Sequence, residues 1–91
     1  MIIEDSMIPQ VSSLVKVRNE DFGLLLVSKK THILALNEDS KVIWECIDGI
    51  KTVKQIAELI NSYLDGEYEE TAEIVKCFIE SCHDLRLLEI K

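Results

Sequence analysis

Residues 34–60 read LALNEDSKVIWECIDGIKTVKQIAELI, and this stretch decides the fold. Before Asn37 the apolar residues alternate with a period of two, which is typical of a strand, and after it they recur with the 3.6-residue period of a helix. Asn37 can cap the first helix, and Gly49 is suited to a left-handed stop behind it. Thr52 and Gln55 have the spacing of a capping box that opens a second helix. The stretch therefore predicts a strand followed by two short helices.

Each predicted helix has one apolar face, and the last one runs from about Glu69 to Leu85. In chain order the three faces consist of Val42, Ile43, Cys46 and Ile47; of Val53, Ile56, Ala57, Ile60 and Leu64; and of Ile74, Val75, Phe78, Ile79, Cys82 and Leu85. Asp65-Gly66 ends the second helix, and Trp44 is best explained as a core or interface anchor.

Two further strands are predicted upstream. Residues 14–18 alternate between β-branched and charged side chains, and residues 22–27 form a continuous apolar run that indicates a central strand covered on both faces. A turn at 19–21 joins them. The third strand covers Thr31 to Leu36, with His32, Leu34 and Leu36 on one side.

The ends of the chain carry weaker signals. Residues 1–13 contain the only proline and few periodic apolar positions, so we expect a loosely ordered lead-in before a single domain at 14–91. Residues 87–90 fit either a short strand or an extended tail. The resulting prediction is an α+β fold, winged helix-turn-helix-like, with a three-stranded antiparallel sheet followed by three helices.

The composition of the chain excludes several classes of function. The 91 residues include 17 acids and 10 bases, giving a net charge of −7, and the longest basic cluster is a turn at Ser28-Lys29-Lys30-Thr31. Such a chain repels phosphate backbones, so we expect no nucleic acid partner. It has neither a basic signal-peptide start nor an apolar run near the ~20 residues that span a bilayer. Three cysteines, an odd number, indicate reduced thiols and a cytoplasmic protein without membrane contact.

The residues of this chain do not form the patterns that catalytic or metal sites need. Cys77 and Cys82 lie five residues apart on a helix and point in different directions, which is not a metal-ligand spacing, and His32 and His83 fall at positions where exposure is the default. The acids of the third helix form a solvated face, and the three glycines are dispersed, with no phosphate loop. We therefore expect no enzyme activity, no metal and no cofactor.

Several short motifs occur in a recognisable order and spacing over residues 14–88. They are Leu36-Asn37, Ser40-Lys41-Val42-Ile43-Trp44, Asp48-Gly49, Thr52-Val53, Ile56 and the segment from Phe78 to Leu88. In this order they resemble the PqqD-like family, whose members are also called RiPP recognition elements. Arg86 departs from the pattern, because the family usually ends its last helix with glycine there. Lys29-Lys30-Thr31 stands where the subfamily that serves pyrroloquinoline quinone synthesis tends to carry Pro-Glu, so a standalone recognition protein of another peptide pathway fits better.

The resemblance implies a binding module for the leader segment of a ribosomally made precursor peptide. In the family the leader adds as a strand beside the third strand and lies against the third helix, which unpaired strand edges permit physically. Carried onto this chain, the peptide-binding residues are Thr31, His32, Ile33, Leu34, Ala35, Leu36, Ile74, Cys77, Phe78 and Ser81. Ile74, Cys77 and Ser81 lie beside the apolar stripe of the last helix, with Phe78 at its edge. Packing on the sheet remains the alternative for Phe78, Cys77 and Ser81.

The implied partners are the precursor peptide and a separate maturation enzyme, such as a radical SAM protein or a leader peptidase. An exposed edge strand and an apolar groove would also allow a homodimer. Two other functions remain open at this point: a winged-helix DNA-binding regulator, which the acidic helices disfavour, and an oligomerising scaffold domain.

Overall fold

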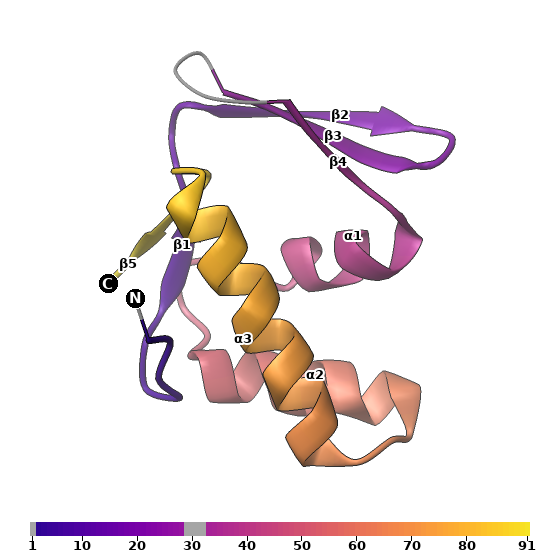
Figure 1. Ribbon diagram of the computed structural model, residues 1–91, viewed down its shortest axis with the longest axis vertical. Coiled ribbons are helices and arrows are strands. Elements are labelled where there is room, and N and C mark those ends of the chain that lie inside the picture. Colours follow the sequence, from indigo (N-terminus) through magenta and orange to yellow (C-terminus); the bar gives the residue numbers. More distant parts are fainter. Residues whose placement is uncertain (1, 29–32) are drawn as a thin grey trace.

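The computed structural model describes residues 2–28 and 33–91, which form five strands and three helices (Figure 1). The strands are β1 (Pro9–Val11), β2 (Val15–Glu20), β3 (Gly23–Ser28), β4 (Ile33–Leu36) and β5 (Leu88–Ile90), and the helices are α1 (Glu38–Glu45), α2 (Val53–Leu64) and α3 (Tyr68–Asp84). The predicted α+β architecture, with an antiparallel sheet followed by three helices, is confirmed.

The three-stranded sheet has the order β2-β3-β4 and is antiparallel throughout. Strand β2 extends to Glu20, so the turn contains only Asp21 and Phe22 and not residues 19–21 as expected. Of the predicted third strand, Ile33–Leu36 is observed, and Thr31 and His32 lie outside the described residues.

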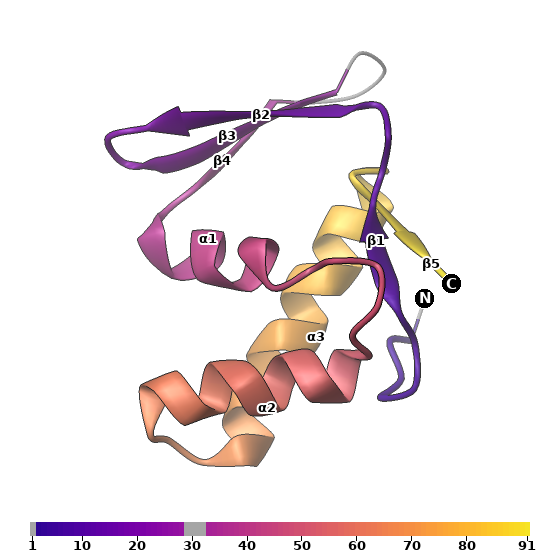
Figure 2. The same cartoon turned by 180° about the vertical axis from the view of Figure 1, so that it is seen from behind.

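Strand β3 is central, as predicted, but it is not covered on both faces. All three helices lie on the same side of the sheet, below it in Figures 1 and 2. Leu24 and Leu26 point to that side and are buried, whereas Leu25 and Val27 on the opposite side are half-exposed. The continuous apolar run therefore gave a wrong expectation for the outer face.

Helix α1 begins where the sequence predicted, because the Asn37 side chain accepts a hydrogen bond from the Ser40 N–H at 2.9 Å. It ends earlier than expected, at Glu45. Gly49 has a left-handed φ of 78° but lies in the following loop. The apolar face is also rotated: Trp44 is buried with Ile43, and Val42 is exposed. Burying the large indole ring under the sheet turns Val42 toward solvent.

Helix α2 has the predicted capping box, with Thr52 and Gln55 each accepting the other's backbone N–H at its side-chain oxygen. Its last residue is Leu64, and the C-cap residue Asp65 takes a left-handed φ of 53°. Leu64 was expected on the buried face but is 63% exposed, since it lies in the last turn beyond the reach of the core.

Helix α3 buries Val75, Ile79 and Cys82 almost completely, but Ile74, which was also placed on its apolar stripe, is 58% exposed. The helix ends in a Schellman motif. The Leu87 N–H donates to the Cys82 carbonyl and the Arg86 N–H to the His83 carbonyl, both at 2.9 Å. Arg86 has a φ of 61° and thus takes the left-handed conformation. It does so at the position where the family it resembles usually has glycine.

The N-terminal segment is an ordered part of the fold, so the prediction of a loosely ordered lead-in at 1–13 is wrong for its described residues. Strand β1 pairs antiparallel with β5, which settles residues 88–90 as a strand. The carbonyls of Met7 and Asp5 accept hydrogen bonds from the Val53 and Lys54 N–H groups at the start of α2. The segment therefore satisfies helix donors that would otherwise lack partners.

We expect Arg86→Gly to raise the free energy of unfolding by roughly 0.5–1 kcal/mol, measured by urea denaturation. A non-glycine residue in the left-handed region costs roughly 1–2 kcal/mol, and the greater freedom of glycine in the unfolded chain cancels part of the gain. Arg86→Ala is the matched control, because it removes the same side chain and keeps the strained backbone. Equal stabilities of the two variants would contradict the assignment.

Candidate functional site

The two edges of the three-stranded sheet differ in chemistry. Strand β2 carries Lys16, Arg18 and Glu20, and charges on an edge strand discourage pairing with another chain. Strand β4 has the sequence ILAL, without any charge. Among the described residues no strand pairs with its outer edge. The β4 edge is therefore open to an additional strand.

The packing of Gly23 shows which peptide groups of β4 point outward. A Cβ on Gly23 would collide with the carbonyl oxygen of Leu36, so this carbonyl is directed toward β3. Peptide groups alternate in direction along an antiparallel strand. In the observed register Leu34 therefore also faces β3, and the N–H and C=O groups of Ile33 and Ala35 face the free edge.

The side chains of β4 divide between the two faces of the sheet as the sequence predicted. Leu36 is buried and Leu34 half-buried on the helix side. Ile33, which is 69% exposed, and Ala35 point to the other side. The candidates Thr31 and His32 lie outside the described residues.

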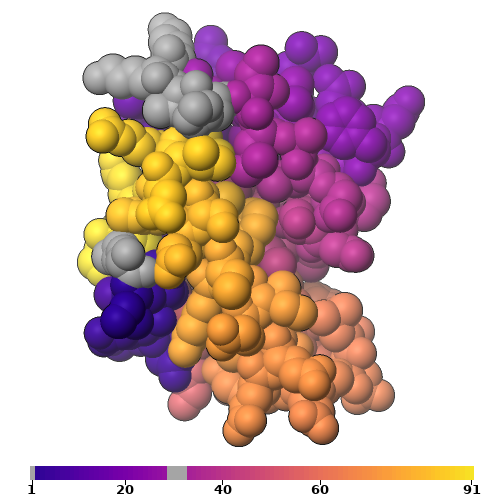
Figure 3. Space-filling model, viewed as in Figure 1, coloured from indigo at the N-terminus to yellow at the C-terminus, as the bar shows by residue number. Residues whose placement is uncertain are grey.

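The four candidate residues on α3 form one line beside its buried stripe. Ile74, Cys77 and Ser81 are exposed and Phe78 is half-buried. In Figures 1 and 3 the edge of β4 and this helix lie on the same side of the molecule, with β4 and α1 in magenta and α3 in orange to yellow. The structure thus places the described candidates on neighbouring parts of one face.

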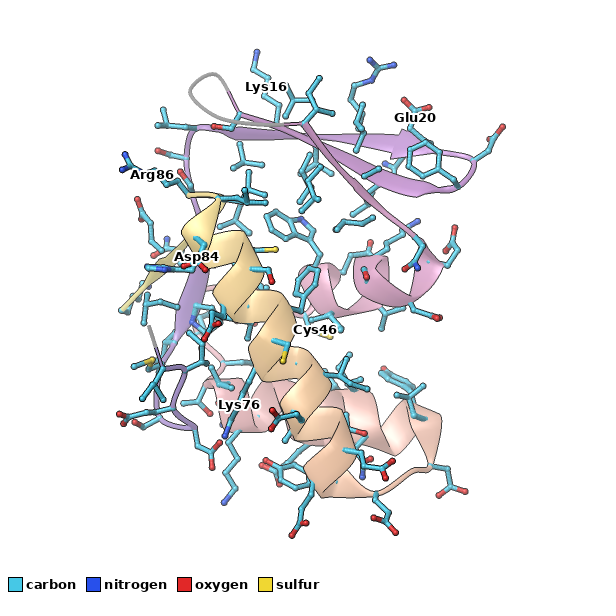
Figure 4. All side chains as sticks on the ribbon, in the orientation of Figure 1. Lys16, Glu20, Cys46, Lys76, Asp84 and Arg86 are labelled. Atoms are coloured by element: carbon cyan, nitrogen blue, oxygen red, sulfur yellow. The ribbon has the colours of Figure 1, made fainter. Side chains whose placement is uncertain are left out.

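Lys76 is directed elsewhere. Its Nζ forms an ion pair with Asp5 Oδ1 at 2.8 Å, and that hydrogen bond raises the pKa of the lysine. Figure 4 shows Lys76 on the flank of α3 near the N-terminal segment. Lys76 therefore ties α3 to the N-terminal segment, away from β4.

An apolar hollow lies between the three helices, away from the edge of β4. It is a cleft of about 610 Å³ between α1, α2 and α3, lined by Asp39, Val42, Ile43, Glu45, Cys46, Ile60, Tyr63, Leu64, Thr71 and Ile74. Of the predicted binding residues that the structure describes, Ile74 alone lines it. A hydrogen bond of 2.8 Å from the Thr71 hydroxyl to Asn61 Oδ1 joins α2 and α3 at the cleft.

Sequence reasoning missed this cleft because it assigned Val42 and Leu64 to the core. Both are apolar residues on helical stripes, and such a pattern does not distinguish a buried face from the wall of an open cleft. The sequence did contain a signal: the predicted helices carry more apolar residues than a short helix needs in order to cover one face of a sheet.

The titratable groups of the described residues offer little chemistry. All three cysteines are free thiols, and burial raises the pKa of Cys82 to about 12. Within residues 2–28 and 33–91 no three His, Cys, Asp or Glu side chains gather in a way that could hold a metal ion. None of the described helices is long and apolar enough to cross a membrane. What this face offers is an apolar surface and a row of unpaired peptide groups.

Comparison with solved structures shows two close likenesses in fold. TbiB1, solved in complex with the TbiA(beta) leader peptide, superposes with a TM-score of 0.79 at 17% identity, covering 88% of this chain and 94% of that one. The PqqD truncation of Methylobacterium extorquens PqqCD, described as a functional and stand-alone RiPP recognition element, gives a TM-score of 0.80 at 19% identity. That likeness covers 96% of this chain and 94% of the truncation.

No curated protein matches the sequence. The family model of coenzyme PQQ synthesis protein D (PqqD) matches residues 23–88, from the start of β3 to the first residue of β5. The match includes the open edge strand, all three helices and the Schellman turn, and it spans more than half of the chain. The chain therefore belongs to the PqqD family.

Proposed function

We propose that this chain binds the leader segment of a ribosomally synthesised precursor peptide by strand addition and presents it to a separate maturation enzyme. The observation that carries the proposal is the open, uncharged edge of β4 beside the exposed flank of α3. The likeness to TbiB1, which was solved with a leader peptide, supports it.

In this proposal the main chain supplies most of the recognition. The outward peptide groups of Ile33 and Ala35 would each exchange hydrogen bonds with the added strand, and a single such bond contributes about 0.5–1.5 kcal/mol net. Thr31 belongs to the proposed site on the sequence argument alone. Side chains of the peptide that point to the helix side would meet Leu34 and Phe78.

The other candidates take distinct roles. Ile74, Cys77 and Ser81 form the exposed flank of α3 that would face the bound strand. Leu36 is buried and its carbonyl faces β3, so in this proposal it would support the strand from the core and leave contact with the peptide to its neighbours. His32 stays in the proposed site on the sequence argument alone.

We propose a radical SAM protein or a leader peptidase as the partner enzyme. A cytoplasmic location suits such a pathway.

DNA binding has no support, because the exposed positions of α2 and α3 include Glu58, Glu69, Glu70 and Glu73, which repel phosphates.

The first test is a Pro substitution at an outward amide. Ala35→Pro removes one donor at the free edge and leaves the pairing between β3 and β4 intact. The probe is a fluorescent synthetic peptide covering the N-terminal half of a short precursor encoded beside this gene, followed by anisotropy. We expect its affinity to fall at least fivefold, because the lost donor leaves a carbonyl of the peptide without a partner, which costs about 1–3 kcal/mol, and about 1.4 kcal/mol corresponds to a factor of ten.

Asn19→Pro is the matched control on the opposite edge. The two-residue turn makes Glu20 and Gly23 a hydrogen-bonded pair, so the Asn19 amide points away from β3. This variant should bind the peptide within twofold of the wild type. Equal losses in both variants, or no loss in Ala35→Pro, would refute strand addition at β4.

A second test uses the cysteines as reporters. N-ethylmaleimide at about pH 7 should modify Cys77, which is exposed, and spare Cys82, whose buried thiol has a raised pKa and almost no reactive thiolate. Saturating peptide should slow the labelling of Cys77 at least fivefold, as followed by mass spectrometry of the digested protein. Unchanged labelling of Cys77 in the loaded protein would remove the α3 flank from the site.

A further inference from the structure

The outer face of the three-stranded sheet is uncovered by any described part of the chain. In Figures 1 and 2 every helix and the β1–β5 pair lie on the other side of the sheet or beside it. This face carries apolar side chains that no packing partner explains: Leu25 and Val27 are half-exposed, and Ile33 and Ala35 are exposed. Apolar patches of this kind mark interaction surfaces.

The strand register orders these side chains into two rows. Lys16 pairs with Val27 and Val27 with Ile33, while Arg18 pairs with Leu25 and Leu25 with Ala35. Directly paired residues of an antiparallel sheet project on the same face, about 5 Å apart. Each row therefore runs from a base on β2, through an apolar residue on β3, to an apolar residue on β4.

Lys16, Arg18 and Glu20 alternate along β2 and project on this face, so two bases and one acid give it a charge of +1, opposite in sign to the −7 of the whole chain. Figure 4 shows the Lys16 side chain pointing away from the helices, and within the described residues no acid forms an ion pair with it. Arg18 pairs with Glu20 at 3.2 Å. A base in each row beside an apolar centre is complementary to an acidic surface with an apolar centre of its own.

Strand addition at β4 would lengthen both rows. A strand paired with Ile33 and Ala35 places every second one of its side chains on the outer face, next in line after those two residues. The loaded sheet then presents a wider surface, which starts at Lys16 and Arg18 and ends with side chains of the peptide. Without the peptide, each row consists only of its residues on β2, β3 and β4.

We propose that the outer face of the β2-β3-β4 sheet is the docking surface for the maturation enzyme. The enzyme contributes an acidic patch around an apolar centre, and it contacts the bound peptide together with Lys16, Arg18, Leu25 and Val27. This inference rests on the proposed function. It explains how an enzyme distinguishes the loaded module from the free one: only the loaded module offers the full surface.

The test measures binding of the purified maturation enzyme encoded beside the precursor gene, by biolayer interferometry in about 0.1 M salt, where surface charges still act over roughly 10 Å. We expect the enzyme to bind the peptide-loaded module at least tenfold more tightly than the free one. By linkage, the enzyme should tighten peptide binding by the same factor. The double variant Lys16→Glu/Arg18→Glu should weaken enzyme binding at least tenfold and leave peptide affinity, measured alone, within twofold.

Lys54→Glu is the matched control, since Lys54 is an exposed lysine on α2, on the helix side of the molecule. It should leave enzyme binding within twofold. Enzyme binding by the double variant at the wild-type level overturns the inference, and so does a failure of loaded wild type to bind the enzyme. If the wild type is a dimer that the double variant dissociates in light scattering, the face joins two copies of this chain, which also overturns it.

The peptide titration separates this failure from failure of the proposed function. A wild type that binds no peptide refutes the function itself. A wild type that binds peptide normally, with an enzyme that ignores Lys16 and Arg18, refutes only the docking surface.

Discussion

Helix α3 holds the molecule together through the stripe of Val75, Ile79 and Cys82, each of which is almost inaccessible to solvent. The Schellman turn behind it brings Leu87 into the same core and passes the chain to β5, where it pairs with β1. Since one side of the helix is fixed by packing, its adjacent flank is fixed as well. The exposed line from Ile74 to Ser81 therefore owes its position to the core, and a peptide would find that wall already formed.

The small size of the sheet explains its open edge and its uncovered face. Three strands leave two edges, and three short helices cover only one face. The β2 edge carries charges and the β4 edge carries none, so another strand pairs more readily with β4 than with β2. The uncovered outer face is a consequence of the same shortage of elements. Ile33 and Ala35 belong to both surfaces. Their main-chain groups point to the free edge, and their side chains point to the outer face.

Local signals in the sequence predicted the local structure. Asn37 caps α1, and Thr52 with Gln55 forms the capping box of α2, because such caps depend on residues only three positions apart. The pairing of β1 with β5 joins residues about 80 positions apart, through three-residue strands too short to show a period. No local pattern could have predicted it, and residues 9–11 were accordingly missed.

The candidate site was predictable in its parts and not in its geometry. The alternation along β4 and the position of Cys77 and Ser81 beside the buried stripe followed from periodicity. The exposure of Val42 and Leu64 did not, because the same pattern of apolar residues on a helix occurs in a core and in the wall of a cleft. The outward direction of the Ile33 and Ala35 amides depends on the register with β3, which a single strand does not encode.

Amide hydrogen exchange of single residues tests the central claim most directly. In the free protein we expect the Ile33 and Ala35 amides to exchange rapidly, while the Leu34 and Leu36 amides, which face β3, exchange slowly. Saturating leader peptide should slow exchange at Ile33 and Ala35 at least tenfold and leave the β2 edge unchanged. Peptide binding without new protection at these two amides, or with protection at Val17 and Asn19, would contradict strand addition at β4.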